Sequence, residues 1–384
     1  MVKAAIAVLY GTAFRGRRNG AAGEVRDPRR ILLINGFHIG DVVIATSVIP
    51  ILRRAYPRAE IGFATGSWSQ MVVRNHPDVT WTHCVDHWKM NRANISFFEK
   101  IRRYRKTRRV ALREIRALRY DVAISLFTNF PDFLDLTWAA RIPVRIGFSR
   151  SVFSSLATDL VHEPESPFVH QGARLAVTLR ALPIEPAHFR FRLSTLPPDD
   201  AASIEEVRSL LGASRLDDIC YCVIHMGKGS VRWEFPRSLW RELAERFSAD
   251  HTLLFTGRGE RECNTIVEVI KGLRNCVNAC DRLTWGGFVA AVRNAEALYG
   301  VDSMAGHVAG AVGTKCIIVS GGAAGVARWR PEGQESIVIT NHVPCAPCLR
   351  AEGCAAMTCM KEIRADDLVR LSGWPREAVP STGH

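Results

Sequence analysis

The sequence predicts an α/β protein of two Rossmann-like domains, each built on a parallel sheet, with the two sheets facing each other across a cleft. Its 384 residues suffice for two domains, at about 100–200 residues per domain. The chain contains two blocks, and within each block short apolar runs alternate with helical stretches. This alternation is the pattern of βα units and parallel sheets. The stretch between the blocks has weak periodicity and is punctuated by Pro183, Pro186, Pro197 and Pro198.

Residues 1–29 are predicted to be a basic leader that precedes the folded chain. Their apolar run ends in Arg-Gly-Arg-Arg and not in a small-residue cleavage site, which is atypical of a signal peptide. We expect the leader to be disordered or interfacial and the protein to be cytoplasmic. The N-terminal domain is expected at 30–195 and the C-terminal domain at 196–384.

The first block opens with a buried strand at 31–35. A helix is expected from Asp41 towards Arg54, and Pro50 should break or kink it. The other elements expected in this block are strands at 59–65, 121–127 and 144–148 and an arginine-rich helix at 99–119.

The second block opens with an amphipathic helix at 201–212, which Gly212 should end. The elements expected after it are strands at 219–225, 252–256, 297–301 and 315–320 and helices at 238–247 and 283–293. Ligands bind at the carboxyl ends of such strands, so the loops after them are the places to look for chemistry.

The composition is that of a globular protein, with 47% hydrophobic and 23% charged residues. It excludes a disordered chain, a coiled coil and collagen-like repeats, and no run of about 18 apolar residues predicts a spanning helix. The net charge of +13 lies in two segments, +5 in residues 1–30 and +8 in residues 99–119. Such a basic surface invites nucleic acid, anionic lipid or a phosphorylated substrate, or it is a solvated helix face.

The loop Asn35-Gly-Phe-His-Ile-Gly-Asp41 follows the first strand. It lacks the full G-x-G-x-x-G pattern, so it does not favour NAD binding. A carboxylate such as Asp41 at a helix start is either a cap or a general base that deprotonates an acceptor hydroxyl. His38 is a loop residue or an acceptor contact.

The loop His225-Met-Gly-Lys-Gly-Ser-Val-Arg-Trp233 directly follows another strand. Its glycines allow close backbone approach, while Lys228 and Arg232 supply positive charge, and together these would hold a diphosphate. The order of residues is not that of a Walker P-loop.

A third loop contains Asp302, Ser303 and His307 and leads into a helix of small residues. Its backbone amides could approach an anion. Tight helix–sheet packing would explain the glycines and alanines, but not Asp302 or His307. A catalytic triad of these three residues is not expected, because they lie within about one helical turn.

Four of the eleven cysteines form a cluster near the C-terminus: Cys345, Cys348, Cys354 and Cys359. Their first spacing, C-x2-C, is typical of a metal or redox site, and four thiolates could hold a structural zinc ion. Disulfides and free thiols are the alternatives. The other seven cysteines are expected to be buried apolar residues.

Three stretches together resemble glycosyltransferase family 9, the heptosyltransferases of lipopolysaccharide core assembly. They are ILLINGFHIGDVVIATSVIPILRRAYPRAEI, HMGKGSVRWEFPRSLWRELAERF, and LTWGGFVAAVRNAEALYGVDSMAGHVAGAVGTKCIIVSGG with ARWRPEG. A cysteine-rich tail like CAPCLRAEGCAAMTCM occurs in many members. The resemblance runs from about Arg30 to about Ile363.

This resemblance implies a GT-B fold and an inverting enzyme that needs no metal or other cofactor for catalysis. By position, Asp41 matches the catalytic base of the family. Arg232, beside Trp233, falls near the family's phosphate-binding lysine, and Lys228 could take that role instead. Asp302, Ser303 and His307 match the stretch that contacts the donor, although Met304 stands where the family usually has glycine.

The implied function is transfer of a sugar, commonly heptose from ADP-heptose, to a lipopolysaccharide-core or related glycan. We expect the anionic acceptor, or the lipid headgroups of the inner leaflet, to contact His38, Arg102, Arg103 and Arg105. No nucleic-acid partner is expected, because no binding motif of that class accompanies the arginines. A transferase with another donor or acceptor, and a non-catalytic nucleotide-sugar-binding homologue, are the alternatives.

Overall fold

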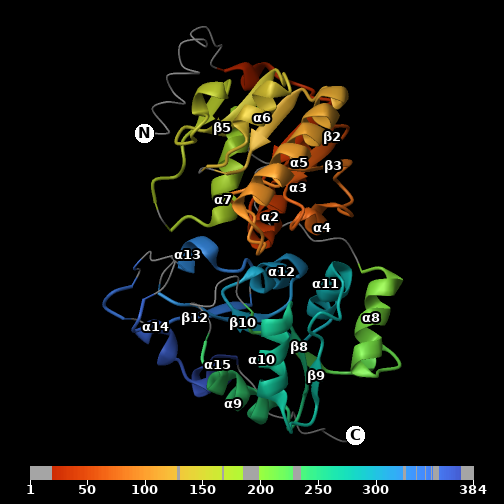
Figure 1. The fold of residues 1–384 in the computed structure, drawn as a ribbon, viewed down its shortest axis with the longest axis vertical. Coiled ribbons are helices and arrows are strands. Elements are labelled where there is room, and N and C mark those ends of the chain that lie inside the picture. The colour runs from red at the N-terminus through yellow and green to blue at the C-terminus, as the bar shows by residue number, and fades with distance from the viewer. Residues whose placement is uncertain are drawn as a thin grey trace, which may run out of the picture. The chain divides into compact units, whose positions relative to one another are not determined.

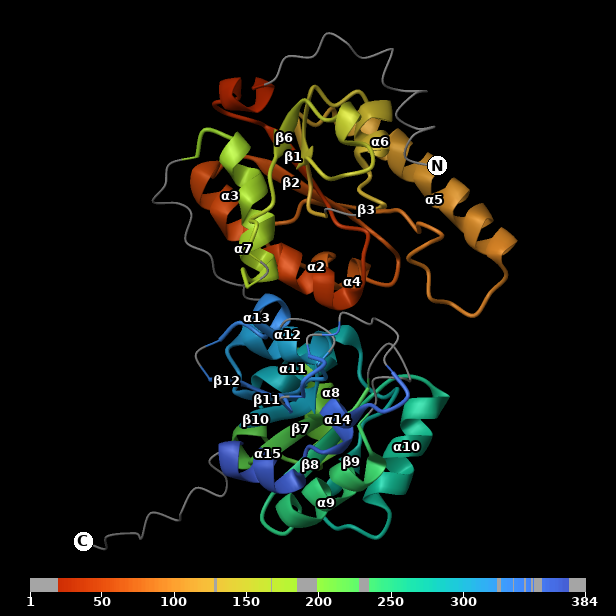
Figure 2. The same ribbon diagram turned by 90° about the vertical axis from the view of Figure 1, so that its left-hand side faces the viewer.

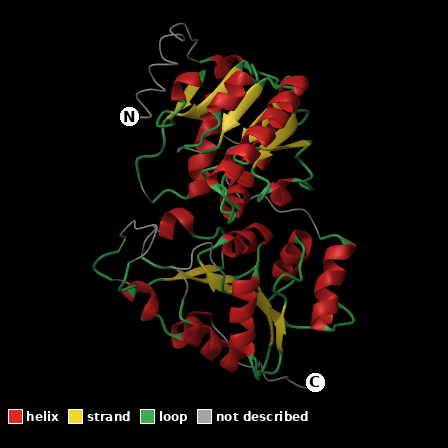
Figure 3. Cartoon of the chain, in the orientation of Figure 1, coloured by secondary structure: helices red, strands yellow, loops and turns green. Residues whose placement is uncertain are grey.

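The computed structural model describes residues 20–127, 130–166, 168–184, 199–227, 235–322, 326–333, 335–341, 343–346, 348 and 354–372. The chain divides into two compact units, Met1–Pro197 and Pro198–His384. Figures 1 and 3 show a sheet flanked by helices in each unit. The predicted boundary after residue 195 lies close to this division.

The first unit holds a six-stranded parallel sheet in the order β3-β2-β1-β4-β5-β6. Its strands are β1 (Arg30–Ile34), β2 (Glu60–Thr65), β3 (Trp81–Cys84), β4 (Val122–Ser125), β5 (Val144–Phe148) and β6 (Asp159–Val161). In register, Leu32 of β1 lies between Gly62 of β2 and Ala123 of β4. The strand order therefore reverses between β1 and β4.

Helices cover both faces of this sheet. They are α2 (Ile39–Ala45), α3 (Ile49–Ala55), α4 (Gln70–Val73), α5 (Phe97–Leu118), α6 (Leu134–Ala139) and α7 (Gln171–Ala176). Figure 2 shows α2, α3 and α7 on one side of the sheet and α5 and α6 on the other. Such alternation follows from right-handed crossovers between parallel strands.

The predicted break at Pro50 is confirmed. A 3-10 turn, Thr46–Val48, separates α2 from α3, and Pro50 stands in the first turn of α3. Proline is tolerated there because the first turn of a helix does not need its N–H.

The second unit has an equivalent sheet, ordered β12-β11-β10-β7-β8-β9. Its strands are β7 (Tyr221–His225), β8 (Thr252–Thr256), β9 (Cys276–Asn278), β10 (Ala297–Val301), β11 (Cys316–Val319) and β12 (Ser336–Ile339). Counted along the chain, both sheets have the order 3-2-1-4-5-6, which is that of the dinucleotide-binding fold.

The helices of the second unit are α8 (Ala201–Leu211), α9 (Arg237–Phe247), α10 (Glu260–Ile270), α11 (Trp285–Arg293), α12 (Met304–Val312), α13 (Val326–Trp329), α14 (Thr358–Lys361) and α15 (Ala365–Ser372). Helix α9 contacts α10 and α15, while α11 contacts α8 and α12. The large side chains of the core include Trp240, Phe255 and Tyr299. None of the described helices is both long and apolar enough to cross a bilayer.

Residues 20–29 lie on the first unit, so this part of the expected leader is not a free segment. Ala22, in the 3-10 turn Ala21–Glu24, is fully buried, and its N–H donates to Asp159. The N–H groups of Arg29 and Arg30 both donate to the Asp121 carboxylate, over 2.7 and 2.9 Å. The rest of the predicted leader lies outside the described residues.

We predict that Gly62→Ala destabilises the first unit by about 2 kcal/mol, because an added Cβ would overlap the Tyr120 hydroxyl. Tyr120 cannot yield easily, since it is buried and bonded through Oη to His83 Nε2 over 2.9 Å. Urea unfolding would measure the loss. The control is Gly23→Ala, whose Cβ meets no atom within 4 Å; equal stability of the two variants would contradict the packing argument.

Candidate active site

The loop that follows β1 is fixed by its neighbours on both sides. The Asn35 amide donates to the Leu126 carbonyl after β4 over 3.3 Å, and its Oδ1 accepts from the Phe37 N–H over 3.2 Å. The Trp68 indole N–H donates to the Phe37 carbonyl over 2.6 Å. The loop therefore holds one position at the point where the strand order reverses.

Asp41 lies at the third position of α2 and is half-buried. The cap residue of this helix is His38, and Asp41 is the acidic residue of its first turn. Arg92, from the loop between β3 and α5, lies near the Asp41 carboxylate. Burial lowers the pKa of Arg92, and the charge of Asp41 opposes that shift. The two charges therefore stabilise each other at the end of β1.

His38 stands beside the same arginine. Burial, and then the charge of Arg92, lower the pKa of His38 to about 4. The imidazole is therefore neutral near pH 7, where it can donate or accept a hydrogen bond but adds no charge to the site.

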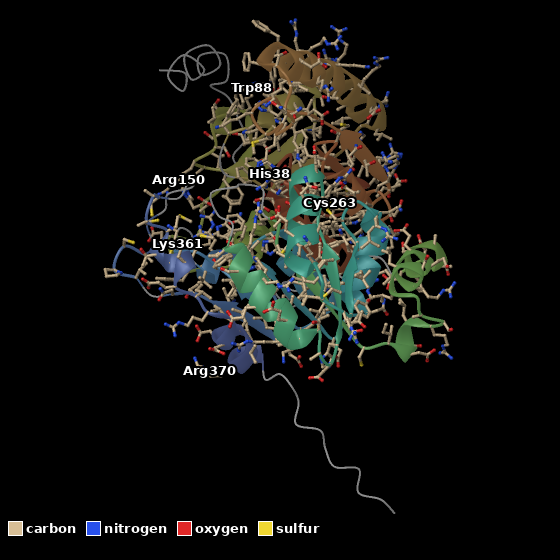
Figure 4. The ribbon with its side chains drawn as sticks, turned by 60° about the horizontal axis from the view of Figure 1, so that its bottom comes forward. His38, Trp88, Arg150, Cys263, Lys361 and Arg370 are labelled. Atoms are coloured by element: carbon tan, nitrogen blue, oxygen red, sulfur yellow. A yellow bond between two sulfur atoms is a disulfide. The ribbon has the colours of Figure 1, made fainter. Side chains whose placement is uncertain are left out.

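A pocket of about 500 Å³ opens next to this loop. Its lining comes from the loops after β1, β3, β4 and β5: Phe37, Lys89, Met90, Phe127, Phe130, Arg150 and Val152. The Phe37 and Phe127 rings stack on each other, and Lys89 Nζ lies 5.3 Å from the centre of the Phe130 ring. Arg150, labelled with His38 in Figure 4, has no ion-pair partner in the described part of the chain. Cations and aromatic rings thus share one cavity.

In the second unit, the corresponding reversal lies between β7 and β10. His225 ends β7, is buried, and bonds through Nδ1 to Thr256 Oγ1 over 3.0 Å. Gly300 of β10 lies so close to the His225 carbonyl that a Cβ would approach it to 2.8 Å. Asp302, two residues after Gly300, donates its N–H to the Val319 carbonyl over 3.0 Å.

Helix α12 begins directly after this strand with Ser303 as its cap residue. The Ser303 side chain makes no capping bond, and among the described residues its buried Oγ has no hydrogen-bond partner. His307, one turn further, is buried at 6% exposure. A helix N-terminus attracts anions, so the arrangement suits a phosphate group near Ser303.

A second feature beside α12 is a small pocket lined by Asp302, Ser320, Trp329 and Arg330, together with Ile318, Val326, Pro331 and Val338. The glycines of α12 allow the chain beside this pocket to pack closely on the helix. A Cβ on Gly306 would lie 2.9 Å from the Pro331 ring, and one on Gly310 would overlap the Glu332 backbone. The packing explanation of these glycines is thus correct, and the packing itself positions Arg330 near Asp302.

The sequence did not single out Glu262. This residue of α10 lies against Gly227 and accepts the Arg258 N–H over 2.9 Å, at the carboxyl ends of β7 and β8. It lines a further pocket with Thr256 and Trp240. No sequence spacing marked it, because it approaches Gly227 only through the pairing of β7 with β8.

The predicted residues are only partly brought together. Lys228, Arg232 and Trp233 lie outside the described residues. Arg102 and Arg103 bond Glu99 on their own helix, over 2.7 and 2.9 Å, and Arg105 is exposed on the same helix. The cation that interacts with His38 and Asp41 is instead Arg92, while Lys89 and Arg150 line the pocket beside Phe37 of the same loop.

Among the described residues, no three of the four clustered thiols lie within 4.8 Å of one another. Cys345 is exposed, Cys359 is packed in the apolar core, and Cys354 Sγ accepts the Met357 N–H over 3.3 Å. Among the described residues, the one group of three possible ligands within 4.8 Å of each other is Cys263, Cys280 and Asp281. Zinc binding by the tail stays a prediction, and no chemistry is derived from it.

Cys263 and Cys280 form a disulfide, which corrects the expectation that both are isolated apolar residues. The bond joins the first turn of α10 to the segment after β9. The prediction failed because a separation of 17 residues carries no pairing signal until the sheet brings β8 and β9 together.

A family model described as glycosyltransferase family 9 (heptosyltransferase) matches residues 108–357, well over half of the chain. The chain belongs to glycosyltransferase family 9. The resemblance expected from the three sequence stretches is thereby confirmed.

Solved structures of family 9 proteins share the fold. A member from Veillonella parvula DSM 2008 is 17% identical, with a TM-score of 0.74 over 92% of this chain and 98% of that one. E. coli ADP-heptose lps heptosyltransferase II is 17% identical, with a TM-score of 0.69 over 89% and 97%. E. coli heptosyltransferase WaaC with ADP is 15% identical, with a TM-score of 0.65 over 89% and 98%. A search of curated proteins finds no match.

These likenesses confirm the predicted fold class, GT-B with two Rossmann-like domains on parallel sheets. At such identities they show the fold alone, so the roles of individual residues depend on the geometry described above.

We predict that stability falls as the pH drops from 7.5 to 5, partly through His225. Burial lowers the pKa of His225 to about 4 from its usual value of 6.5, so the unfolded chain binds the proton first and unfolding is favoured below pH 6.5. For this residue the loss at pH 5 is about 2 kcal/mol.

The difference in unfolding free energy between the two pH values should shrink by about that amount in His225→Asn. Urea unfolding at each pH would measure it, with the exposed His162→Asn as control. A pH difference unchanged from wild type in His225→Asn would refute the assignment.

Proposed function

We propose that this family 9 protein is an inverting, metal-independent transferase that moves heptose from ADP-heptose to a lipopolysaccharide-core or related glycan. The observation that carries the proposal is a half-buried carboxylate, Asp41, fixed beside Arg92 and next to a pocket of cations and aromatic rings. Support for the donor comes from WaaC, which has been solved with ADP and with ADP-2-deoxy-2-fluoro heptose.

In the proposed mechanism, Asp41 accepts the proton of the acceptor hydroxyl while that oxygen attacks the anomeric carbon. The bond from that carbon to the diphosphate oxygen breaks in the same step, with inversion of configuration. The base must be ionised before the acceptor binds, and Arg92 places a positive charge beside it. Neutral His38 can hold a sugar hydroxyl without competing for the proton.

The departing ADP gains negative charge, which the second unit is equipped to stabilise. The N-terminus of α12 with its free Ser303 hydroxyl, and Arg330 in the adjacent pocket, offer donors and positive charge. Lys228 and Arg232, with Trp233 beside them, are proposed from the sequence to complete this set. Asp302 and His307 are proposed to contact the donor sugar. Cations and helix dipoles can do this without Mg²⁺.

The acceptor is proposed to bind in the pocket of the first unit. Aromatic rings present flat apolar faces to a sugar ring, while Lys89 and Arg150 can pair with a carboxylate or phosphate on the same molecule. An anionic acceptor also agrees with the predicted place of action, the cytoplasmic surface of the inner membrane, which is part of this proposal.

We predict that Asp41→Asn lowers turnover at least 100-fold, because an amide cannot accept the proton of the acceptor hydroxyl. The assay is ADP release from ADP-heptose in the presence of a Kdo-bearing core fragment. Stabilisation of the fold by ADP should not change, since Asp41 belongs to the acceptor side. Asp27→Asn, which removes a carboxylate that is 67% exposed, is the control. Turnover retained in Asp41→Asn would remove this residue from the base role.

We further predict that Arg150→Gln raises the KM for the core fragment at least tenfold and leaves the KM for ADP-heptose unchanged. The reason is that a charge-assisted hydrogen bond to the acceptor anion is lost. Arg74→Gln, also exposed on the first unit, should change neither constant. A rise in the donor KM alone would show that the pocket belongs to the donor.

A further inference from the structure

The N-terminal end of α5 carries two exposed aromatic side chains. Phe97 is 56% and Phe98 is 84% exposed, and their rings meet edge to face. Trp88, labelled in Figure 4, packs edge to face on Phe97 with 5.5 Å between ring centres. Figure 2 shows this end of α5 projecting away from the sheet of the first unit. Apolar rings gathered at a projecting end are a mark of an interaction surface.

The same helix presents a basic stripe to solvent. At 100° per residue, Phe98 shares one helix face with Arg102, Arg105, Arg109 and Arg113. All four arginines are exposed. Arg102 pairs with Glu99, whereas the other three make no ion pair within the described residues. Their charge is therefore available to an external anion.

The opposite face of α5 is committed to the core of the first unit. Ala111 and Ile115 are fully buried, and Tyr104 packs on the same apolar cluster. The helix cannot rotate to hide the stripe without losing these contacts. With 22 residues, α5 presents a rigid edge about 33 Å long.

The basic stripe continues past the C-terminal end of α5. Arg116, in register with Arg113, lines a wide pocket with Arg119 and Arg141, beside Asp121. Arg119 and Arg141 at this opening suit the phosphate of a headgroup, while the Arg116 guanidinium donates to the Ala139 carbonyl over 2.7 and 3.0 Å. Basic residues thus extend from Arg102 of α5 to Arg141, with the aromatic rings at the N-terminal end of the helix.

From this geometry we propose that the first unit docks on an anionic lipid bilayer through α5. Phe98, supported by Phe97 and Trp88, enters the interfacial layer, while Arg105, Arg109 and Arg113 lie on the anionic headgroups. The rings lie together at one end of α5 and are not interleaved with the arginines. This argues against a nucleic-acid partner, because single strands stack on aromatic residues that alternate with cations along a groove. It also argues against a purely electrostatic contact, which would not need exposed phenylalanine.

This inference deepens the membrane part of the proposed function and concerns attachment, not transfer. It is testable with vesicles that contain neither sugar donor nor glycan acceptor. Its failure would leave the transferase proposal standing, and failure of transfer would leave the docking surface standing.

The experiment is co-sedimentation of the full chain with vesicles of phosphatidylcholine, with and without phosphatidylglycerol. We expect binding to the anionic vesicles. Arg109→Gln/Arg113→Gln should weaken it about 30-fold, because each basic residue near such a surface contributes about 1 kcal/mol. Phe98→Ser should weaken it about tenfold by removing apolar area from the bilayer.

Matched controls are Arg215→Gln/Arg274→Gln, exposed arginines of the second unit, and Phe168→Ser, which removes a 75% exposed ring from the first unit outside α5. Neither should alter vesicle binding. Phe98→Ser should also retain transfer to a soluble core fragment, which shows that it folds.

Two results would overturn the docking proposal. One is equal binding of wild type and Phe98→Ser to anionic vesicles. The other is tight binding of single-stranded RNA that is lost in Arg109→Gln/Arg113→Gln and kept in Phe98→Ser, which would assign the stripe to nucleic acid.

Discussion

Both units depend on one constraint, the parallel pairing of the first strand with the fourth, β1 with β4 and β7 with β10. The connections that leave these strands run to opposite faces of the sheet, so a crevice forms outside their carboxyl ends. Hydrogen bonds then fix the loops there. In the first unit the Asn35 side-chain amide donates to the Leu126 carbonyl, and in the second the Asp302 N–H donates to the Val319 carbonyl. The proposed base and the donor-side helix are thus positioned before any substrate arrives.

The two units use different electrostatics at these crevices. The first relies on side-chain cations, with Arg92 beside Asp41 and with Lys89 and Arg150 in the adjoining pocket. The second combines the N-terminus of α12, which Gly306 and Gly310 allow to pack closely against residues 331 and 332, with Arg330 of the adjacent pocket. Flexible cations suit an acceptor of variable shape, whereas a helix terminus in a fixed core suits a diphosphate of constant geometry.

Sequence patterns predicted the inner strands and failed at the sheet edges. The four unpredicted strands, β3, β6, β9 and β12, are the outermost strands of the two sheets, and each buries one residue at most. A half-exposed strand of three or four residues has no continuous apolar run to detect. The loop after β1 was recognised with Asp41 and His38, but Arg92, Lys89 and Arg150 were missed. These cations approach the loop from irregular segments that only the tertiary fold brings near. The Cys263–Cys280 disulfide was missed for the same reason.

The central claim is that the donor side of this family 9 protein holds an ADP-linked sugar, and nucleotide-dependent thermal stabilisation tests it most directly. ADP, UDP, GDP and dTDP, each alone and as the sugar conjugate, would be compared without added metal. The account predicts stabilisation by ADP and ADP-heptose only, by about 2.7 kcal/mol at a ligand concentration 100 times the Kd. Stabilisation by UDP- or GDP-sugars in place of ADP-heptose, or by none of the panel, would contradict it.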